Sequence, residues 1–298
     1  MTETLRQDYL DPEVLQQLST MKLRAKRLAD GVIAGLHRSP HHGGSIEFSE
    51  YIEYTPGHEL RHIDWKVYGN TDRFYVKQFE DETNLEAYAV VDASGSMDFA
   101  GETAPFTKLA YANHLAATLS YVLVNQGDSV GAMGFASTAG TFLPPSAGPG
   151  HLDEMLYLLE HLEGAGTTAL DEALQRVAQQ ARRRSLVMIF SDFLDADEQT
   201  FNLLRVLRSR DLDVALFHIL DDAELELPYE GLTVFEGLED EGELLVDPDD
   251  IRLTYQKKIK EHCARLKSNC EQADIGYLRT TTTAALEECC LQFLRRRT

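Results

Sequence analysis

Basic residues are scarce in this sequence of 298 residues. It has 28 Lys and Arg against 49 Asp and Glu, which gives a formal net charge of −21 at pH 7. Binding to a phosphate backbone depends on Lys and Arg, because these side chains displace the condensed counterions. We therefore expect that nucleic acid is not a partner of this protein.

Long apolar runs and paired cysteine motifs are also missing. The sequence has no stretch of 18 uninterrupted apolar residues, and its amino terminus has no basic segment followed by an apolar one. It therefore predicts no membrane span and a cytoplasmic location. The four cysteines lack a C-x-x-C spacing, so we expect buried thiols rather than disulfides or a zinc site. They are Cys263, Cys270, Cys289 and Cys290.

The order of apolar patterns after residue 84 indicates the fold class. Hydrophobic residues make up 43% of the chain, which is enough for a full core. Strand-like segments at 85–92, 128–135, 141–143, 185–190, 214–220 and 275–278 alternate with helical patterns at 106–126, 151–162, 169–183, 200–208, 249–273 and 284–295. This alternation predicts an α/β fold, a doubly wound and mostly parallel sheet with helices on both faces.

Two further regions accompany this predicted domain. Residues 1–83 form an amino-terminal part, with helical spacing over 11–36 and a small β-rich annex at 45–82, and residues 84–298 form the α/β domain. An acidic insertion near 224–247 contains a predicted hairpin. His37, His41 and His42 invite a metal interpretation, but a loop is favoured because no carboxylate or thiol follows at ligand spacing.

Oxygen-bearing side chains follow three of the predicted strands. Asp92, Ser94 and Ser96 follow the first, Thr167 or Thr168 follows a glycine-rich loop, and Asp192 follows a later strand. The ends of parallel strands share one edge of the sheet, where such folds place ligands. An all-oxygen set suits Mg²⁺ or Mn²⁺ rather than zinc or copper. The alternative is that the hydroxyls cap the following helices and that Asp192 closes a turn.

Two motifs in this chain resemble known families. The run EFSEYIEYTPGHELRHIDWKVYGNTDRFYVKQFEDETN at 47–84 is similar to the signature of the bacterial family catalogued as domain of unknown function 58. DASGSM at 92–97 resembles the metal-site loop of von Willebrand factor type A domains, which that family carries. The resemblance extends from about residue 36 to the carboxyl terminus.

The resemblance implies a metal-ion-dependent adhesion site. Its D-x-S-x-S loop, threonine and later aspartate would fall on Asp92, Ser94, Ser96, Thr168 and Asp192. Thr168 is preferred to Thr167 because Thr168 stands at the family's spacing before Ala173-Leu174. Two carboxylates and three hydroxyls leave Mg²⁺ short of six ligands, so water or a carboxylate from another protein must complete the shell. The family resemblance also implies a partnership with AAA+ ATPases of the MoxR type.

These features predict a non-enzymatic, metal-dependent protein-binding module, an adaptor in the maturation or remodelling of a client protein. The alternative is a Mg²⁺-dependent hydrolase acting on phosphate esters. It would need a base such as His58 or His62, although a charge-paired annex that includes Asp64 explains that segment better. Ser94 and Ser96 lie in an S-G-S run and not in the G-x-S-x-G elbow, and the sequence contains no P-loop. A structural scaffold without a metal is a third possibility.

Overall fold

A six-stranded sheet forms the centre of the molecule. The computed structural model describes residues 21–37, 51–53, 75–77, 85–239 and 242–297. The strand order is β10-β7-β6-β3-β4-β5; the first five strands run parallel, and β5 pairs antiparallel with β4. The strands are β3 (Glu86–Asp92), β4 (Ser129–Phe135), β5 (Ala139–Ser146), β6 (Leu186–Ser191), β7 (Asp213–Leu220) and β10 (Gly276–Thr281).

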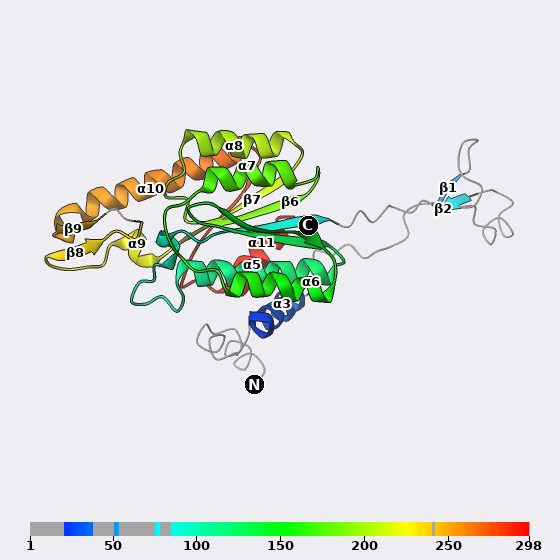
Figure 1. The fold of residues 1–298 in the computed structure, drawn as a ribbon, viewed down its shortest axis with the longest axis horizontal. Helices are drawn as coiled ribbons and strands as arrows, with labels where there is room; N and C mark the ends of the chain where they lie inside the picture. The colour runs from blue at the N-terminus through cyan, green and yellow to red at the C-terminus, as the bar shows by residue number, and fades with distance from the viewer. Residues whose placement is uncertain (1–20, 38–50, 54–74, 78–84, 240–241, 298) are drawn as a thin grey trace.

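Helices cover both faces of this sheet (Figure 1). One face carries α3 (Met21–His37), α5 (Lys108–Asn125), α6 (Pro149–Glu160) and α11 (Leu286–Arg295). The other carries α7 (Leu170–Gln180), α8 (Glu198–Ser209) and α10 (Pro248–Gln272). This arrangement confirms the predicted α/β fold class.

The central strand β3 is apolar from Ala87 to Val91 because it is covered on both faces. Its residues alternate between the two cores: Ala89 and Val91 pack under α5, and Tyr88 and Val90 pack on the α7 side. A strand covered on both faces needs apolar side chains at every position, so the run lacks the polar alternation of a half-exposed strand. The run ends at Asp92, where the strand leaves the core.

Two short helical elements were not predicted from the sequence. A 3₁₀ turn, η2 (Gly95–Asp98), follows β3, and α9 (Asp222–Glu226) follows β7. The predicted hairpin in the acidic insertion is present as β8 (Thr233–Glu236) paired with β9 (Glu243–Val246). The insertion predicted to begin at residue 224 therefore starts inside a helix.

The amino-terminal part is described over three short ranges. Helix α3 lies in the region of predicted helical spacing and buries Leu28 and Val32 in the core that α5 also lines. Strands β1 (Tyr51–Glu53) and β2 (Tyr75–Lys77) pair antiparallel within the predicted annex. The division after residue 83 stays a prediction. His41, His42, His58, His62 and Asp64 lie outside the described residues.

The cysteines and the helices bear on two of the predictions drawn from missing features. All four cysteines are free and buried, as expected from their spacing. Within the described ranges, no helix is both long enough and apolar enough to cross a membrane.

Candidate metal centre at the carboxyl edge of the sheet

The strand register brings the two predicted aspartates together. Strands β3 and β6 are parallel neighbours, and Val91 pairs with Phe190. Asp92 is therefore level with Ser191, and Asp192 is the next residue along the chain. Both carboxylates lie at the carboxyl edge of the sheet, where ligands of such folds bind. They are almost completely buried, at 1% and 4% exposure.

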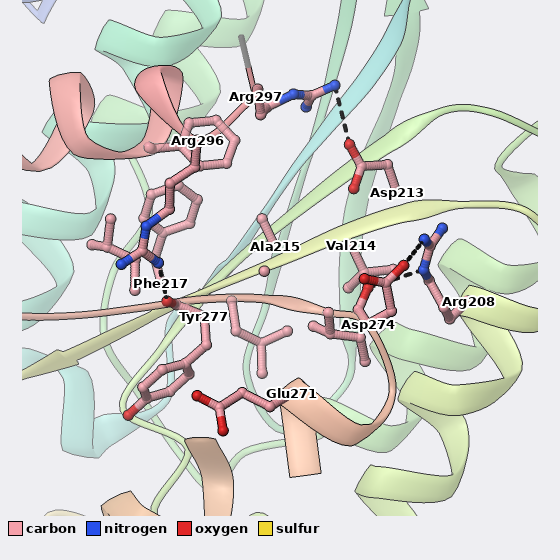
Figure 2. A pocket seen from close by; sticks show the side chains of 15 residues that line it. Arg208, Asp213, Val214, Ala215, Phe217, Glu271, Asp274, Tyr277, Arg296 and Arg297 are labelled. Carbon is pink, nitrogen blue, oxygen red and sulfur yellow. Dashed lines mark hydrogen bonds and ion pairs between the residues drawn. The ribbon is translucent and has the colours of Figure 1, made fainter. Parts of the chain in front are cut away.

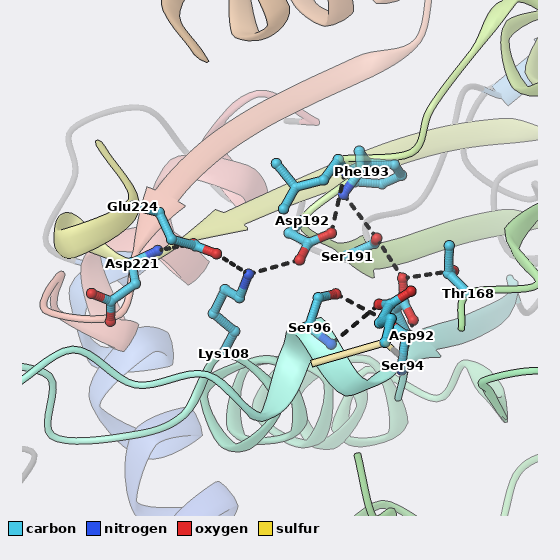
Figure 3. A network of polar contacts seen from close by, with 12 residues as sticks. Asp92, Ser94, Ser96, Lys108, Thr168, Ser191, Asp192, Phe193, Asp221 and Glu224 are labelled. Carbon is cyan, nitrogen blue, oxygen red and sulfur yellow. Dashed lines mark hydrogen bonds and ion pairs between the residues drawn. The ribbon is translucent and has the colours of Figure 1, made fainter. Parts of the chain in front are cut away.

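Asp92 is held by neutral donors only (Figure 3). The backbone N–H of Ser94 donates to Oδ1 at 3.0 Å, and the hydroxyls of Ser191 and Thr168 donate to Oδ2 at 2.7 and 3.2 Å. Burial, together with the nearby charge of Asp192, raises the pKa of Asp92 to about 6. The raised pKa means that ionised Asp92 is unfavourable in this buried position, and a bound cation would stabilise the ionised form.

Backbone contacts join the loop after Asp92 to the glycine-rich loop before α7. The N–H of Gly95 donates to the carbonyl of Gly166 at 2.8 Å, and that of Ala165 donates to the carbonyl of Ala93 at 3.0 Å. Gly166 has φ +71°, a backbone conformation in which a residue with a side chain would be strained. These contacts place Thr168 beside Asp92.

The hydroxyl groups point into the site rather than capping helices. Ser94 stands at the N-cap of η2 and Ala169 at the N-cap of α7, and neither provides a side-chain capping bond. The Oγ atoms of Ser94 and Ser96 instead lie 3.1 Å apart, and Thr168 donates to Asp92. The capping interpretation of Ser94 and Thr168 is therefore wrong. Asp192 does close a turn, because it accepts the N–H of Leu194 at 3.2 Å.

Lys108 is the main residue of the site that sequence reasoning missed. It belongs to the first turn of α5, and its side chain is fully buried. Its Nζ donates to Asp192 Oδ2 at 2.7 Å and to Glu224 Oε1 at 2.5 Å. Burial alone would lower the pKa of Lys108, but the two carboxylates outweigh it and raise the pKa. Burial alone would raise the pKa of Asp192, but Lys108 outweighs it and the pKa is lowered.

Glu224 reaches the site from the short helix α9. A capping box fixes α9, in which Asp221 accepts the N–H of Ala223 and Glu224 accepts that of Asp221, both at 2.8 Å. Burial outweighs the attraction of Lys108, so the pKa of Glu224 is raised. Lys108 thus bridges Asp192 and Glu224. The D-x-x-E spacing of 221–224 was the sequence signal for this cap.

The turn of the β8–β9 hairpin adds a further carboxylate. Glu239 Oε1 accepts the backbone N–H of Ser96 at 3.2 Å. The carbonyl of Leu238 comes so near Gly95 that a Cβ there would lie 2.1 Å from it. Only glycine fits at this close approach. The hairpin therefore covers the Ser96 side of the site.

An open acidic cleft of about 420 Å³ reaches the site from the side of α7 and α8. Asp92, Thr168 and Asp192 line it together with Asp171, Asp195 and Asp197, and its described lining includes no Lys or Arg. No group of three or more His, Cys, Asp or Glu suited to a metal occurs in the described residues. A cation here would thus depend on hydroxyl oxygens, and the all-oxygen donors and the excess of negative charge fit Mg²⁺ or Mn²⁺. Asp92, Ser94, Ser96, Thr168 and Asp192 would hold it.

A second cleft, of about 460 Å³, lies near the amino-terminal ends of β7 and β10 (Figure 2). Its charges are already paired, since Arg208 contacts Asp274 and Arg297 contacts Asp213. Arg296 donates to the carbonyl of Tyr277. Matched charges of this kind leave no excess that would attract an ion, so this larger cleft is the weaker candidate.

Comparison with known proteins supports the resemblance seen in the sequence. The family described as "Protein of unknown function DUF58" matches residues 50–265. Uncharacterized proteins of Mycobacterium tuberculosis strain H37Rv and Mycobacterium bovis are each 32% identical over 240 residues, covering 79% of this chain and 74% of theirs.

The solved structures that match this chain have low sequence identity to it. The conserved hypothetical protein BatB from Bacteroides thetaiotaomicron is 16% identical, with 71% of this chain and 98% of that chain covered and a TM-score of 0.48. The SpRpn10 VWA domain is 11% identical, with 70% and 95% covered and a TM-score of 0.44.

Proposed function

Because this chain belongs to the DUF58 family, whose description names no activity, we propose its function from the site itself. The protein is a metal-dependent protein-binding module. Asp92, Ser94, Ser96, Thr168 and Asp192 hold Mg²⁺ or Mn²⁺, and a carboxylate of a partner protein completes the ligand shell. The partner most consistent with the family resemblance is a MoxR-type AAA+ ATPase in the cytoplasm, for which this protein acts as an adaptor.

One observation carries this proposal. Two buried carboxylates, Asp92 and Asp192, end neighbouring parallel strands, and the internal ammonium of Lys108 pairs with only one of them. The other, Asp92, has a raised pKa and faces a cleft rich in acids. A divalent cation would relieve the repulsion between the two carboxylates. Its remaining coordination positions would then accept an oxygen ligand from a partner.

Cation binding can be tested directly by calorimetric titration of metal-stripped protein with MgCl₂ and MnCl₂. We expect saturable binding that Asp92→Asn abolishes. Asp98→Asn is the matched control, because Asp98 is an exposed carboxylate of the same loop. Binding heat that persists unchanged in Asp92→Asn would contradict the metal centre.

Partner binding requires a separate experiment. Immobilised protein should retain a purified MoxR-type ATPase in Mg²⁺ but not in EDTA, and Asp92→Asn should retain none in either buffer. Metal binding without retention would refute the partner and leave the metal centre intact. Metal-dependent turnover of phosphate esters that Asp192→Ala removes would favour the hydrolase alternative instead.

A further inference from the structure

The β8–β9 hairpin exposes an unusual amount of apolar surface. Within the described residues, ten large hydrophobic side chains are exposed, and five of them belong to this short segment. They are Leu232, Val234, Leu238, Leu244 and Leu245. The hairpin lies beside α9 and the start of α10, outside the main sheet (Figure 1). Exposed apolar side chains gathered in this way mark interaction surfaces more often than scattered ones do.

The pairing of the two strands sorts these side chains onto two faces. Val234 is opposite Leu245, and Glu236 is opposite Glu243. Because side chains alternate along a strand, these four residues share one face of the ribbon, which we call the hairpin face. Phe235 lies on the other face and packs edge-on against Tyr229, with ring centroids 5.5 Å apart. All four residues of the hairpin face are exposed, whereas on the other face Thr233, Phe235 and Val246 are half-buried and Leu244 is exposed.

The charges of the hairpin face specify a cationic occupant. Glu236 and Glu243 are both exposed and directly opposite each other, an arrangement that destabilises an isolated antiparallel pair. Among the described residues, neither forms an ion pair. The sequence contains no Lys or Arg between Arg210 and Arg252, so the hairpin itself carries no basic side chain. A Lys or Arg from outside would turn this repulsion into attraction.

We infer that the hairpin face docks a segment of another protein that carries Lys or Arg beside aliphatic side chains. The aliphatic groups would cover Val234 and Leu245, and the basic group would lie between Glu236 and Glu243. A second copy of this chain fits poorly, because two hairpin faces would bring four glutamates together. The inference does not depend on the proposed metal.

This surface adjoins the metal centre. The hairpin turn contacts the loop after Asp92 through Glu239 and the backbone of Ser96. A segment docked on the hairpin face would therefore lie on the hairpin whose turn covers the Ser96 side of the site. One partner could bind the hairpin face and the metal centre together. Binding at the first site would raise the effective concentration at the second, so the overall affinity would exceed that of either site alone.

The test uses three short fluorescent peptides whose binding is followed by anisotropy in EDTA at physiological ionic strength. One alternates Leu with Lys, the second alternates Leu with Glu, and the third alternates Ser with Lys. We expect the Leu–Lys peptide to bind wild-type protein at least about tenfold more tightly than either of the others. Its binding should protect the backbone amides of 233–246 from hydrogen exchange, which locates the contact without any substitution.

Variants separate this surface from the overall negative charge. Val234→Ser with Leu245→Ser, and separately Glu236→Gln with Glu243→Gln, should each weaken Leu–Lys binding about tenfold. The control pair Glu154→Gln with Glu163→Gln removes two exposed acids elsewhere and should change binding less than about twofold. Asp92→Asn should bind as wild type, which distinguishes this surface from the metal centre.

Equal weakening by the control pair, or equal binding of the Ser–Lys peptide, would show attraction to net charge alone and refute the inference. Protection outside 233–246 would refute it as well. A dimer in sedimentation that Val234→Ser with Leu245→Ser dissociates, and that the peptide does not disrupt, would assign the hairpin face to self-association instead.

Discussion

Asp92 and Asp192 are the same residue type in nearly the same position, but their surroundings differ in one respect. Asp92 ends one central parallel strand, Asp192 directly follows the neighbouring strand, and each is almost fully buried. Asp92 accepts hydrogen bonds from neutral groups, and its pKa rises to about 6. Asp192 accepts a hydrogen bond from the ammonium of Lys108, and its pKa falls below its usual range.

The difference shows that burial alone does not decide the charge state of a carboxylate. Desolvation penalises both aspartates, and only the one with an internal cation overcomes it. When ionised, Asp92, Asp192 and Glu224 carry three negative charges, and Lys108 cancels one of them. The remaining two are the charge that one divalent cation would balance. Lys108 thus stabilises Asp192 and Glu224, but not Asp92, in the absence of metal.

Replacing Lys108 should give the largest effect, because it removes the feature that distinguishes the two aspartates. In EDTA, Lys108→Met leaves Asp192 and Glu224 buried without a counter-ion, which should lower the free energy of unfolding by about 3–5 kcal/mol. The same variant should bind Mg²⁺ more tightly than wild type, because its site carries one more uncompensated negative charge. Urea denaturation at neutral pH, with and without Mg²⁺, measures both effects.

The control for this experiment is Lys257→Met. Lys257 pairs with Glu261 at the surface of α10, with both side chains largely exposed, so its replacement should cost less than about 1 kcal/mol. If Lys108→Met in EDTA were as stable as this control, Lys108 would not be the counter-ion of Asp192.

The raised pKa of Asp92 predicts a dependence of stability on pH. Its pKa is 3.8 in the unfolded chain and about 6 in the folded one, so folding favours the protonated form. The stabilisation this provides is complete below pH 4 and disappears as the pH rises through 6, a loss of about 3 kcal/mol. Asp92→Asn should remove this decline, so its stability relative to wild type should increase from pH 4 to pH 7 in EDTA.

Asp98→Asn tests whether the burial of Asp92 causes this pH dependence of stability. Asp98 is exposed in the same loop, so this variant should follow the wild-type pH profile. Saturating Mg²⁺ should flatten the wild-type profile, because a cation favours the ionised carboxylate. A profile for Asp92→Asn that matched wild type at every pH would mean that Asp92 does not titrate between the two values.

The sequence could predict the elements of the fold and the positions of the strand-end oxygens. Apolar continuity located β3 and β6, and the position of Asp92 and Asp192 at their ends followed from parallel pairing. The predicted hairpin was confirmed because its alternation and its glycines are local signals. The elements depend on neighbours in the chain, and the shared edge follows from the general geometry of parallel strands, so both can be inferred from a single sequence.

The charge partners were beyond such reasoning because they come from distant segments. Lys108 begins a mostly apolar helix, where a lysine normally faces solvent, and its partners follow 84 and 116 residues later. Ser191 was not among the predicted site residues, although its hydroxyl donates to Asp92. Glu224 was assigned to an acidic insertion rather than to a helix cap. Their roles depend on tertiary contacts that periodicity does not encode.

Replacing Glu224 tests the second carboxylate that pairs with Lys108. Glu224→Gln leaves Lys108 paired with Asp192 alone, so the apo protein should lose about 1–2 kcal/mol of a charged hydrogen bond. With one negative charge fewer, the site should bind Mg²⁺ more weakly, which is opposite to Lys108→Met. Glu226→Gln, an exposed position of the same helix, should change neither quantity appreciably. Equal Mg²⁺ affinity in all three proteins would separate Glu224 from the metal centre.

Thr168 offers the smallest and most selective change on the Asp92 side. Its hydroxyl donates to Asp92 at 3.2 Å, whereas the neighbouring Thr167 is exposed. Thr168→Val keeps the shape of the side chain and removes one neutral donor, so the apo protein should lose about 0.5–1 kcal/mol. Loss of that oxygen should also weaken Mg²⁺ binding, while Thr167→Val should leave both stability and Mg²⁺ binding unchanged. The two threonines are adjacent and chemically identical. A stronger effect of Thr167→Val would therefore show that Thr168 is not the ligand and would favour Thr167, the alternative left open by the sequence.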